Sequence, residues 1–278
     1  MTAVTWPDHR ELAGGLAAVA ARPVDWPGLG RAEPESLAII VVPTRAVVDS
    51  LTGGRAPPWA VGLADPGSRI ILLAADSPDI HRTLRHELAH LALHQFVRAR
   101  VPLWFDEGYA GWAAGEWSRL GGLELNLAVA RGAVPELREL DGTLRRSRAS
   151  AGPAYALAMT AVLELARRHP AGTLDPLLER LRAGDDFENA VRSTTGLSLG
   201  EFQTAWRRSV RSRYTIATWL VAGGAWGLIG AAVVGVAVWR RRRDRPRRAA
   251  LDQDWPEPPD PEADLGEQSP VLDRTPGA

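Results

Sequence analysis

Two histidines four residues apart, His86 and His90, are the residues whose spacing most clearly suggests chemistry, in the run His-Glu-Leu-Ala-His. Residues four apart on an α-helix differ by about 40° around the axis, so both imidazoles leave one face and can bind one zinc ion. Glu87 lies beside them, where it can take a proton from a water molecule that the metal activates. The alternative is that both histidines are ordinary, partly buried helix residues.

A zinc ion held by two histidines needs a third protein ligand, and several side chains compete for that role. Glu107, seventeen residues after the second histidine, is the preferred candidate, and Asp106 competes with it. Adjacent helical residues point about 100° apart, so only one of the two can face the metal. His94 continues the spacing of four, but it lies about 12 Å along the axis from His86, too far to share one ion. We expect His81 at the surface. The sequence therefore predicts one Zn²⁺ per chain, bound by two histidines and a carboxylate.

The elements that must position these residues are a small β-sheet followed by helices. Short apolar runs predict strands at 36–42, 59–63 and 69–74. A helix should begin with Ser77 as its N-cap and Pro78 in its first turn, and it carries both histidines. After the break at Pro102, a second helix at 104–116 carries Glu107.

Further helices are expected where apolar residues recur with the helical period. We place them at 7–21, 44–51, 122–131, 153–168, 173–183, 185–194 and 198–213. Ser198 and Glu201 have the spacing of a capping box, and Gly184 fits just past a helix end. Residues 145–150 are expected to form an exposed loop. The expected fold class is therefore α+β, with a small N-terminal sheet and a mostly helical second half.

Composition excludes several kinds of site. The chain has 278 residues with 33 basic and 33 acidic side chains, every basic residue is Arg, and there is no Cys. A disulfide framework, a thiolate zinc site, an iron–sulfur cluster and a cysteine nucleophile are therefore excluded. The zero net charge argues against a globally basic nucleic-acid-binding protein.

The charges are unevenly distributed, and this pattern predicts a membrane anchor. Residues 216–239 contain no charged side chain, and a helix of that length is about 36 Å long, enough to cross a hydrocarbon core of about 30 Å. Residues 240–248 hold seven Arg, whereas 249–278 hold eight acidic residues and one Arg. The positive-inside rule then places the C-terminal tail in the cytoplasm of a bacterial cell and the larger N-terminal part outside the membrane. Met1–Arg22 has no signal-peptide pattern, which leaves open an upstream start or an inward-facing, tail-anchored chain.

The chain is thus expected to have four parts. These are an N-terminal extension at 1–36, a domain at 37–214, a single transmembrane helix at 215–239, and an Arg-rich collar with a disordered acidic tail at 240–278. Beside a membrane span, the Arg collar first suggests anionic lipid rather than nucleic acid.

The histidine motif, followed by Pro-Leu-Trp-Phe-Asp-Glu-Gly-Tyr-Ala at 102–110, resembles the gluzincin metallopeptidases, specifically the bacterial peptidase MA-like domains. The resemblance covers roughly residues 37–213. Three further stretches are similar to that family: 59–74, 152–155 and 181–206.

This resemblance implies a zincin-like fold and a peptide or protein substrate. It implies zinc ligands at His86, His90 and Glu107, with Glu87 as the general base and acid of peptide-bond hydrolysis. It also implies that the strand at 69–74 is the edge strand along which an extended peptide adds by backbone pairing.

Two features bear on the type of peptidase. Nothing between Trp59 and Pro78 matches the Gly-x-Met-Glu-Asn run with which zinc aminopeptidases of the wider clan hold a free amine, so we expect an endopeptidase. The family uses a Tyr or His to stabilise the oxyanion, and Tyr155 is the candidate, with a buried structural role as the alternative. The competing hypothesis is a non-catalytic, membrane-anchored binding module. Glu87 argues against it, because binding alone needs no general base.

Overall fold

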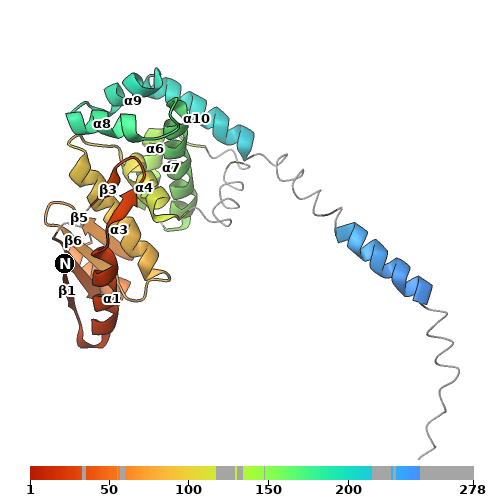
Figure 1. Ribbon diagram of the computed structural model, residues 1–278, viewed down its shortest axis with the longest axis horizontal. Helices are drawn as coiled ribbons and strands as arrows, with labels where there is room; N and C mark the ends of the chain where they lie inside the picture. Colours follow the sequence, from red (N-terminus) through yellow and green to blue (C-terminus); the bar gives the residue numbers. More distant parts are fainter. Residues whose placement is uncertain are drawn as a thin grey trace, which may run out of the picture. The chain divides into compact units, whose positions relative to one another are not determined.

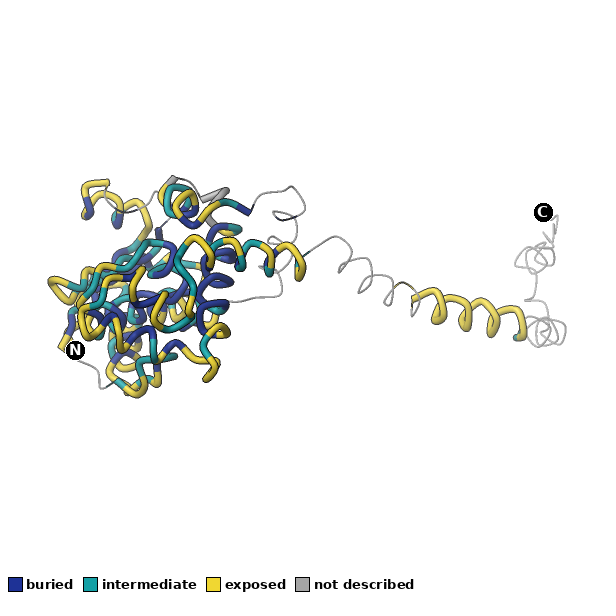
Figure 2. The backbone as a smooth tube through the Cα atoms, turned by 90° about the horizontal axis from the view of Figure 1, so that it is seen from above, coloured by how far each residue is buried: buried dark blue, intermediate teal, exposed yellow. Residues whose placement is uncertain are grey.

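The computed structural model describes residues 1–32, 36–54, 56, 60–116, 129, 134–146, 148–214, 227 and 230–244. The chain divides into two units, Met1–Trp219 and Leu220–Ala278. Figure 2 shows the buried residues of the first unit gathered in its interior. The first unit has an α+β fold with a small N-terminal sheet and a mostly helical body, as predicted.

A four-stranded sheet forms the N-terminal half, in the order β1-β4-β6-β5 (Figure 1). The strands are β1 (Thr2–Thr5), β4 (Ala38–Val42), β5 (Gly62–Asp65) and β6 (Ile70–Ala74). β1, β4 and β6 are parallel, whereas β5 runs antiparallel to β6. A separate hairpin joins β2 (Val24–Trp26) to β3 (Gly30–Ala32).

The prediction that the strand at 69–74 is the edge strand is wrong. β6 lies inside the sheet between β4 and β5, and β5 forms the edge. The run Ile-Ile-Leu-Leu-Ala is apolar throughout, and four of its five residues are buried, which suits a strand covered on both faces. β5 is shorter and ends at the exposed Asp65, and a short strand with a charged residue is suited to the edge of a sheet.

Helices cover both faces of the sheet. On one face lie α1 (Arg10–Ala20), preceded by the short helix η1 (Pro7–His9), and α3 (Ile80–Phe96). Leu16 and Leu84 from these helices share a core with Ile39 and Ile71 of the sheet. On the other face, Val48 of α2 (Arg45–Thr52) packs with β4 and β6.

α3 begins two residues later than its predicted first turn. Asp79, not Ser77, is the N-cap, and its Oδ1 accepts the backbone N–H of Arg82 at 3.0 Å. The hydroxyl of Ser77 lies 2.9 Å from that of Thr83 instead. Both residue types are good N-caps, so local sequence did not distinguish them.

The second half of the unit is helical. Its elements are α4 (Leu103–Ala114), α6 (Leu137–Arg146), α7 (Arg148–Arg168), α8 (Asp175–Ala183), α9 (Phe187–Thr195) and α10 (Leu199–Arg213). The capping box of Ser198 and Glu201 is present, and Gly184 is the left-handed C-cap of α8, as predicted.

The prediction of a loop at 145–150 is wrong, because α6 and α7 extend into this range from either side. α6 was not predicted, although Leu137, Leu140 and Leu144 recur at helical spacing and are all buried. The predicted helix at 122–131 lies, except for residue 129, outside the described residues.

The second unit is described only at 227 and 230–244, where the chain is helical. Val233, Val234 and Trp239 on this helix are exposed. Within the described ranges, no helix is both long enough and apolar enough to cross a membrane. Much of the predicted transmembrane segment, at 215–226 and 228–229, and the acidic tail at 249–278 lie outside these ranges.

Candidate metal centre

α3 and α4 bring the predicted site residues together, and buried aromatic side chains hold α4 in place. Trp104, Phe105 and Tyr109 of α4 are almost fully buried in the helical core. Gly108 lets α4 approach α7 closely, since a Cβ there would lie only 2.6 Å from the carbonyl oxygen of Ala158. Because these residues face the core, the intervening Glu107 points toward α3.

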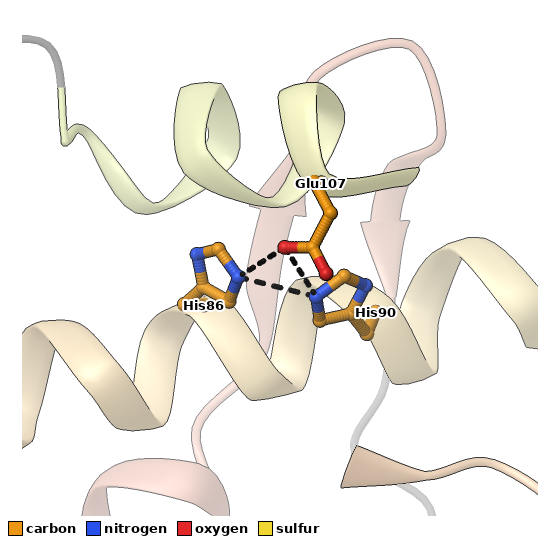
Figure 3. Close-up of side chains that lie close together, drawn as sticks. All are labelled: His86, His90 and Glu107. Atoms are coloured by element: carbon orange, nitrogen blue, oxygen red, sulfur yellow. Dashed lines mark hydrogen bonds and ion pairs between the residues drawn. The ribbon is translucent and has the colours of Figure 1, made fainter. Parts of the chain in front are cut away.

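Three side chains converge between the two helices (Figure 3). His86 Nε2 and His90 Nε2 lie 3.1 Å apart, and Glu107 Oε2 lies 3.4 Å from the first and 3.7 Å from the second. Two ligands of a tetrahedral zinc ion, each bonded at about 2.0–2.1 Å, are about 3.3 Å apart. The separations and the donor types therefore fit a zinc ion, and the fourth position would remain open for water or substrate.

Two further carboxylates hold the outward nitrogens of the imidazoles. Asp106 Oδ1 lies 2.7 Å from His90 Nδ1, and Glu116 Oε1 lies 3.0 Å from His86 Nδ1. A carboxylate at Nδ1 keeps the proton on that nitrogen and leaves Nε2 free to face the metal. Asp106, the rival ligand in the sequence, thus lies on the outer side of the histidine.

Glu116 was not predicted to belong to the site. It follows Gly115, whose left-handed conformation ends α4 and turns the chain back toward α3. No spacing rule links Glu116 to His86, thirty residues earlier. The only sequence signal was a carboxylate just past a glycine C-cap on the helix that carries Glu107.

The charges of the cluster are strongly coupled. Burial lowers the pKa of His86, but hydrogen bonds to Glu107 and Glu116 outweigh it and raise that pKa to about 10. Burial also lowers the pKa of His90, while Asp106 and Glu107 raise it well above its usual value. The pKa values of the two carboxyl groups are lowered overall. Burial raises them, but the neighbouring histidines outweigh burial and hold the pKa of Asp106 at about 2 and the pKa of Glu107 well below its usual range. Metal binding must therefore displace protons from the imidazoles.

Glu87 lies on α3 between the two histidines and is 7% exposed. Burial raises its pKa. Its carboxylate lies against β5, since a Cβ on Gly62 would be 2.6 Å from Glu87 Oε1. Glu87, the three converging side chains and β5 line one cavity of about 370 Å³.

Tyr155 and Tyr109 occupy different environments. Tyr155 comes from α7 and lines the same cavity, and its ring centroid lies 6.2 Å from that of His86. Its pKa is raised well above the usual value by burial and by Glu107. The Tyr109 hydroxyl instead donates to the Pro27 carbonyl oxygen at 3.0 Å and helps to fix α4 against the β2–β3 hairpin.

The other two histidines of this helix differ in their contacts. His81 is exposed near the start of α3, as expected. His94 lines the cavity, and its Nε2 lies 2.8 Å from Asp106 Oδ2. It does not join the three converging side chains.

The two histidines of α3 and the carboxylate of α4 form a group that fits a metal ion, and together with the family match they indicate a metallopeptidase-type protein. The chain belongs to the Peptidase MA superfamily, whose match spans residues 36–212, more than half of its length. This confirms the family that the histidine motif predicted. No match was found among curated proteins.

Proposed function

We propose that this protein is a zinc-dependent endopeptidase. The observation that carries the proposal is the convergence of His86, His90 and Glu107 within one cavity that also holds the Glu87 carboxylate. Two histidines and one carboxylate are the protein ligands of a catalytic rather than a structural zinc site, and they would leave a fourth position for water or substrate if zinc were bound.

The roles of the residues follow from this arrangement. Zinc, when bound, supplies a Lewis acid that polarises a peptide carbonyl and increases the acidity of water. Glu87 takes a proton from the attacking water at its carboxylate and delivers it to the nitrogen of the leaving amine. Tyr155, at the cavity wall beside His86, donates a hydrogen bond from its hydroxyl group to the oxyanion that forms from the peptide carbonyl.

The edge strand β5 offers the substrate a backbone to pair with. The Val61 carbonyl oxygen accepts a hydrogen bond from the Ala74 N–H at 2.8 Å, so the backbone polar groups of Val61 point toward β6. Backbone direction alternates along an antiparallel strand, and the polar groups of Gly62 and Ala64 therefore point to the outer side of β5, which pairs with no other strand among the described residues. An extended peptide that pairs there would pass over Glu87.

The cavity lining favours an internal peptide bond over a chain end. Among the described residues that line it, none is an Arg that could bind a C-terminal carboxylate. Glu116, a carboxylate that could hold a free amine, is already paired with His86. Both observations support an endopeptidase.

The test combines metal content with hydrolysis of an unfolded protein substrate by the purified full-length chain. We expect about one zinc per chain, loss of zinc in Glu107→Ala, and loss of hydrolysis with retained zinc in Glu87→Gln. Glu179→Gln, on the exposed surface of α8, is the matched control and should leave both unchanged. A Glu87→Gln variant that still hydrolyses the substrate would exclude Glu87 as the base. A wild-type protein that binds zinc but cleaves no peptide would favour the binding-module hypothesis.

We further propose that residues 215–239 anchor the enzyme in a bacterial cell membrane, with the catalytic domain outside and the tail in the cytoplasm. The charge-free run, the Arg collar and the exposed valines of the 230–244 helix support this. The protein should resist extraction from membranes by alkaline carbonate, and a reporter fused after Ala278 should be active in the cytoplasm. Release by carbonate, or a reporter active only outside, would contradict the topology.

A further inference from the structure

One carboxylate joins two imidazoles at the edge of the metal centre. Asp106 Oδ1 lies 2.7 Å from His90 Nδ1, and its second oxygen, Oδ2, lies 2.8 Å from His94 Nε2. Both oxygens of the carboxylate are therefore engaged, and both partners come from successive turns of α3. The proposed mechanism assigns no role to His94.

The same three side chains lie close enough to be considered as a metal site of their own. The ligand atoms of His90, His94 and Asp106 are within 4.8 Å of one another. However, His90 directs Nε2 toward His86 and Glu107, and only its Nδ1 faces Asp106. With Nε2 on the zinc ion, a second ion at Nδ1 would require loss of both imidazole protons. The neutral arrangement, with Nδ1 donating to Asp106, avoids this cost.

We propose that His94 is a positioning residue of the zinc site: it donates a hydrogen bond from Nε2 to Asp106 Oδ2 and thereby holds the carboxylate that orients His90. The inference rests on the proposed zinc site and extends it by one further contact. The effect passes through hydrogen bonds at 2.8 Å and 2.7 Å, with no direct contact between His94 and the metal.

The exposure of these side chains supports a hydrogen-bonding role over a packing role. The His94 side chain is 33% exposed at the cavity wall, so its removal leaves no sealed hole in the core. The Asp106 side chain is 17% exposed and reaches the same cavity. Without His94, Oδ2 would face cavity water, and the carboxylate could rotate away from His90 Nδ1. Loss of an outer partner of a metal ligand typically lowers metal affinity by about 10–100-fold.

The experiment compares His94→Ala with His94→Gln in the full-length protein. The amide nitrogen of Gln can reach the place of Nε2 and donate to Asp106, but Gln is a poor zinc ligand. We expect His94→Ala to bind one zinc with about tenfold lower affinity, the lower end of that range, because His94 acts through Asp106. We expect His94→Gln to recover affinity to within about threefold of wild type. His81→Ala, an exposed histidine on the same helix, should match wild type.

The readouts are zinc affinity by chelator competition, zinc stoichiometry, and the visible spectrum of the cobalt-substituted protein. Unchanged cobalt bands in His94→Ala, together with the weaker affinity and the Gln rescue, would support a positioning role. Two zinc ions in wild type and one in both variants would make His94 a ligand and overturn the proposal. Affinity within twofold of wild type in His94→Ala would also overturn it. Because these measurements need no substrate, they separate this inference from the proposed function, which fails if wild type binds no zinc.

Discussion

Gly62→Ala should reduce hydrolysis without removing the metal. Gly62 lies in β5 directly against Glu87, and a Cβ there would be 2.6 Å from Glu87 Oε1, 2.7 Å from Thr83 Cγ2 and 3.1 Å from Glu87 Cδ. The backbone of Gly62 is ordinary extended strand, so alanine adds a steric effect and no backbone strain. The three atoms nearest the added Cβ belong to Glu87 and Thr83, so the substitution acts first on the proposed base and not on a metal ligand.

The magnitude follows from these distances. Ordinary contact begins at 3.4 Å, so the Glu87 carboxylate must move by about 0.8 Å, or β5 must move away from α3 by a similar amount. A displacement of about 1 Å at a reacting group can cost about 100-fold in rate, equivalent to about 2.7 kcal/mol of barrier. We therefore expect kcat to fall by about 100-fold, with zinc content unchanged.

The assay is steady-state hydrolysis of an unfolded protein substrate, with zinc content measured on the same samples. Gly67→Ala, in the turn between β5 and β6, is the matched control, because its nearest contact would be an ordinary 3.4 Å to Asp65 Oδ1. Adding Thr83→Ser removes the methyl group at 2.7 Å and leaves the contacts with Glu87 Oε1 and Cδ. The double variant should keep the lowered kcat of Gly62→Ala if Glu87 is the affected group. A Gly62→Ala enzyme within threefold of wild-type kcat would refute the reasoning, as would parallel loss of zinc.

Two further predictions concern packing and pH. Gly108→Ala should destabilise the protein by about 1–3 kcal/mol or more, because the added Cβ would lie 2.6 Å from the Ala158 carbonyl oxygen and force α4 from α7. Thermal unfolding measures this, with Gly14→Ala in α1, which has nothing within 4 Å, as a control that should be neutral or stabilising. Between pH 6.5 and 8.5, zinc affinity should rise by about tenfold per pH unit for each proton that zinc displaces. The pKa of His86 in the metal-free protein is about 10, so this imidazole is protonated throughout that range and must lose a proton to bind the metal. Chelator competition across this range tests it, and a plateau above pH 7.5 would indicate a histidine of ordinary pKa.

The parts of the fold that follow from local interactions were predictable. The capping box at Ser198 and the left-handed Gly184 depend on contacts within one helical turn, and both are present. The convergence of His86 and His90 is also local, because a spacing of four on a helix is enough to bring two side chains to one face.

Strand order and helix ends depended on contacts that the local pattern does not contain. β5 and β6 are both short strands, and the pairing of β6 with β4 decides which of them is the edge. β1 was missed because it is largely exposed and becomes a strand by pairing with β4, more than thirty residues later. The choice of Asp79 over Ser77 as the cap of α3 depended on where the first turn begins.

By itself, the sequence determined the family, the two histidines, the adjacent glutamate and the carboxylates at 106 and 107, because helical periodicity and a recognisable motif connect residues that are close along the chain. Only the tertiary structure decided which carboxylate faces the metal position and which ones hold the outer nitrogens. Burial of Trp104, Phe105 and Tyr109 sets the rotation of α4 about its own axis, and that rotation directs Glu107 inward and Asp106 toward His90 and His94. The roles of Glu116 and Gly62 arise in the same way, from the packing of α4 and β5 against α3.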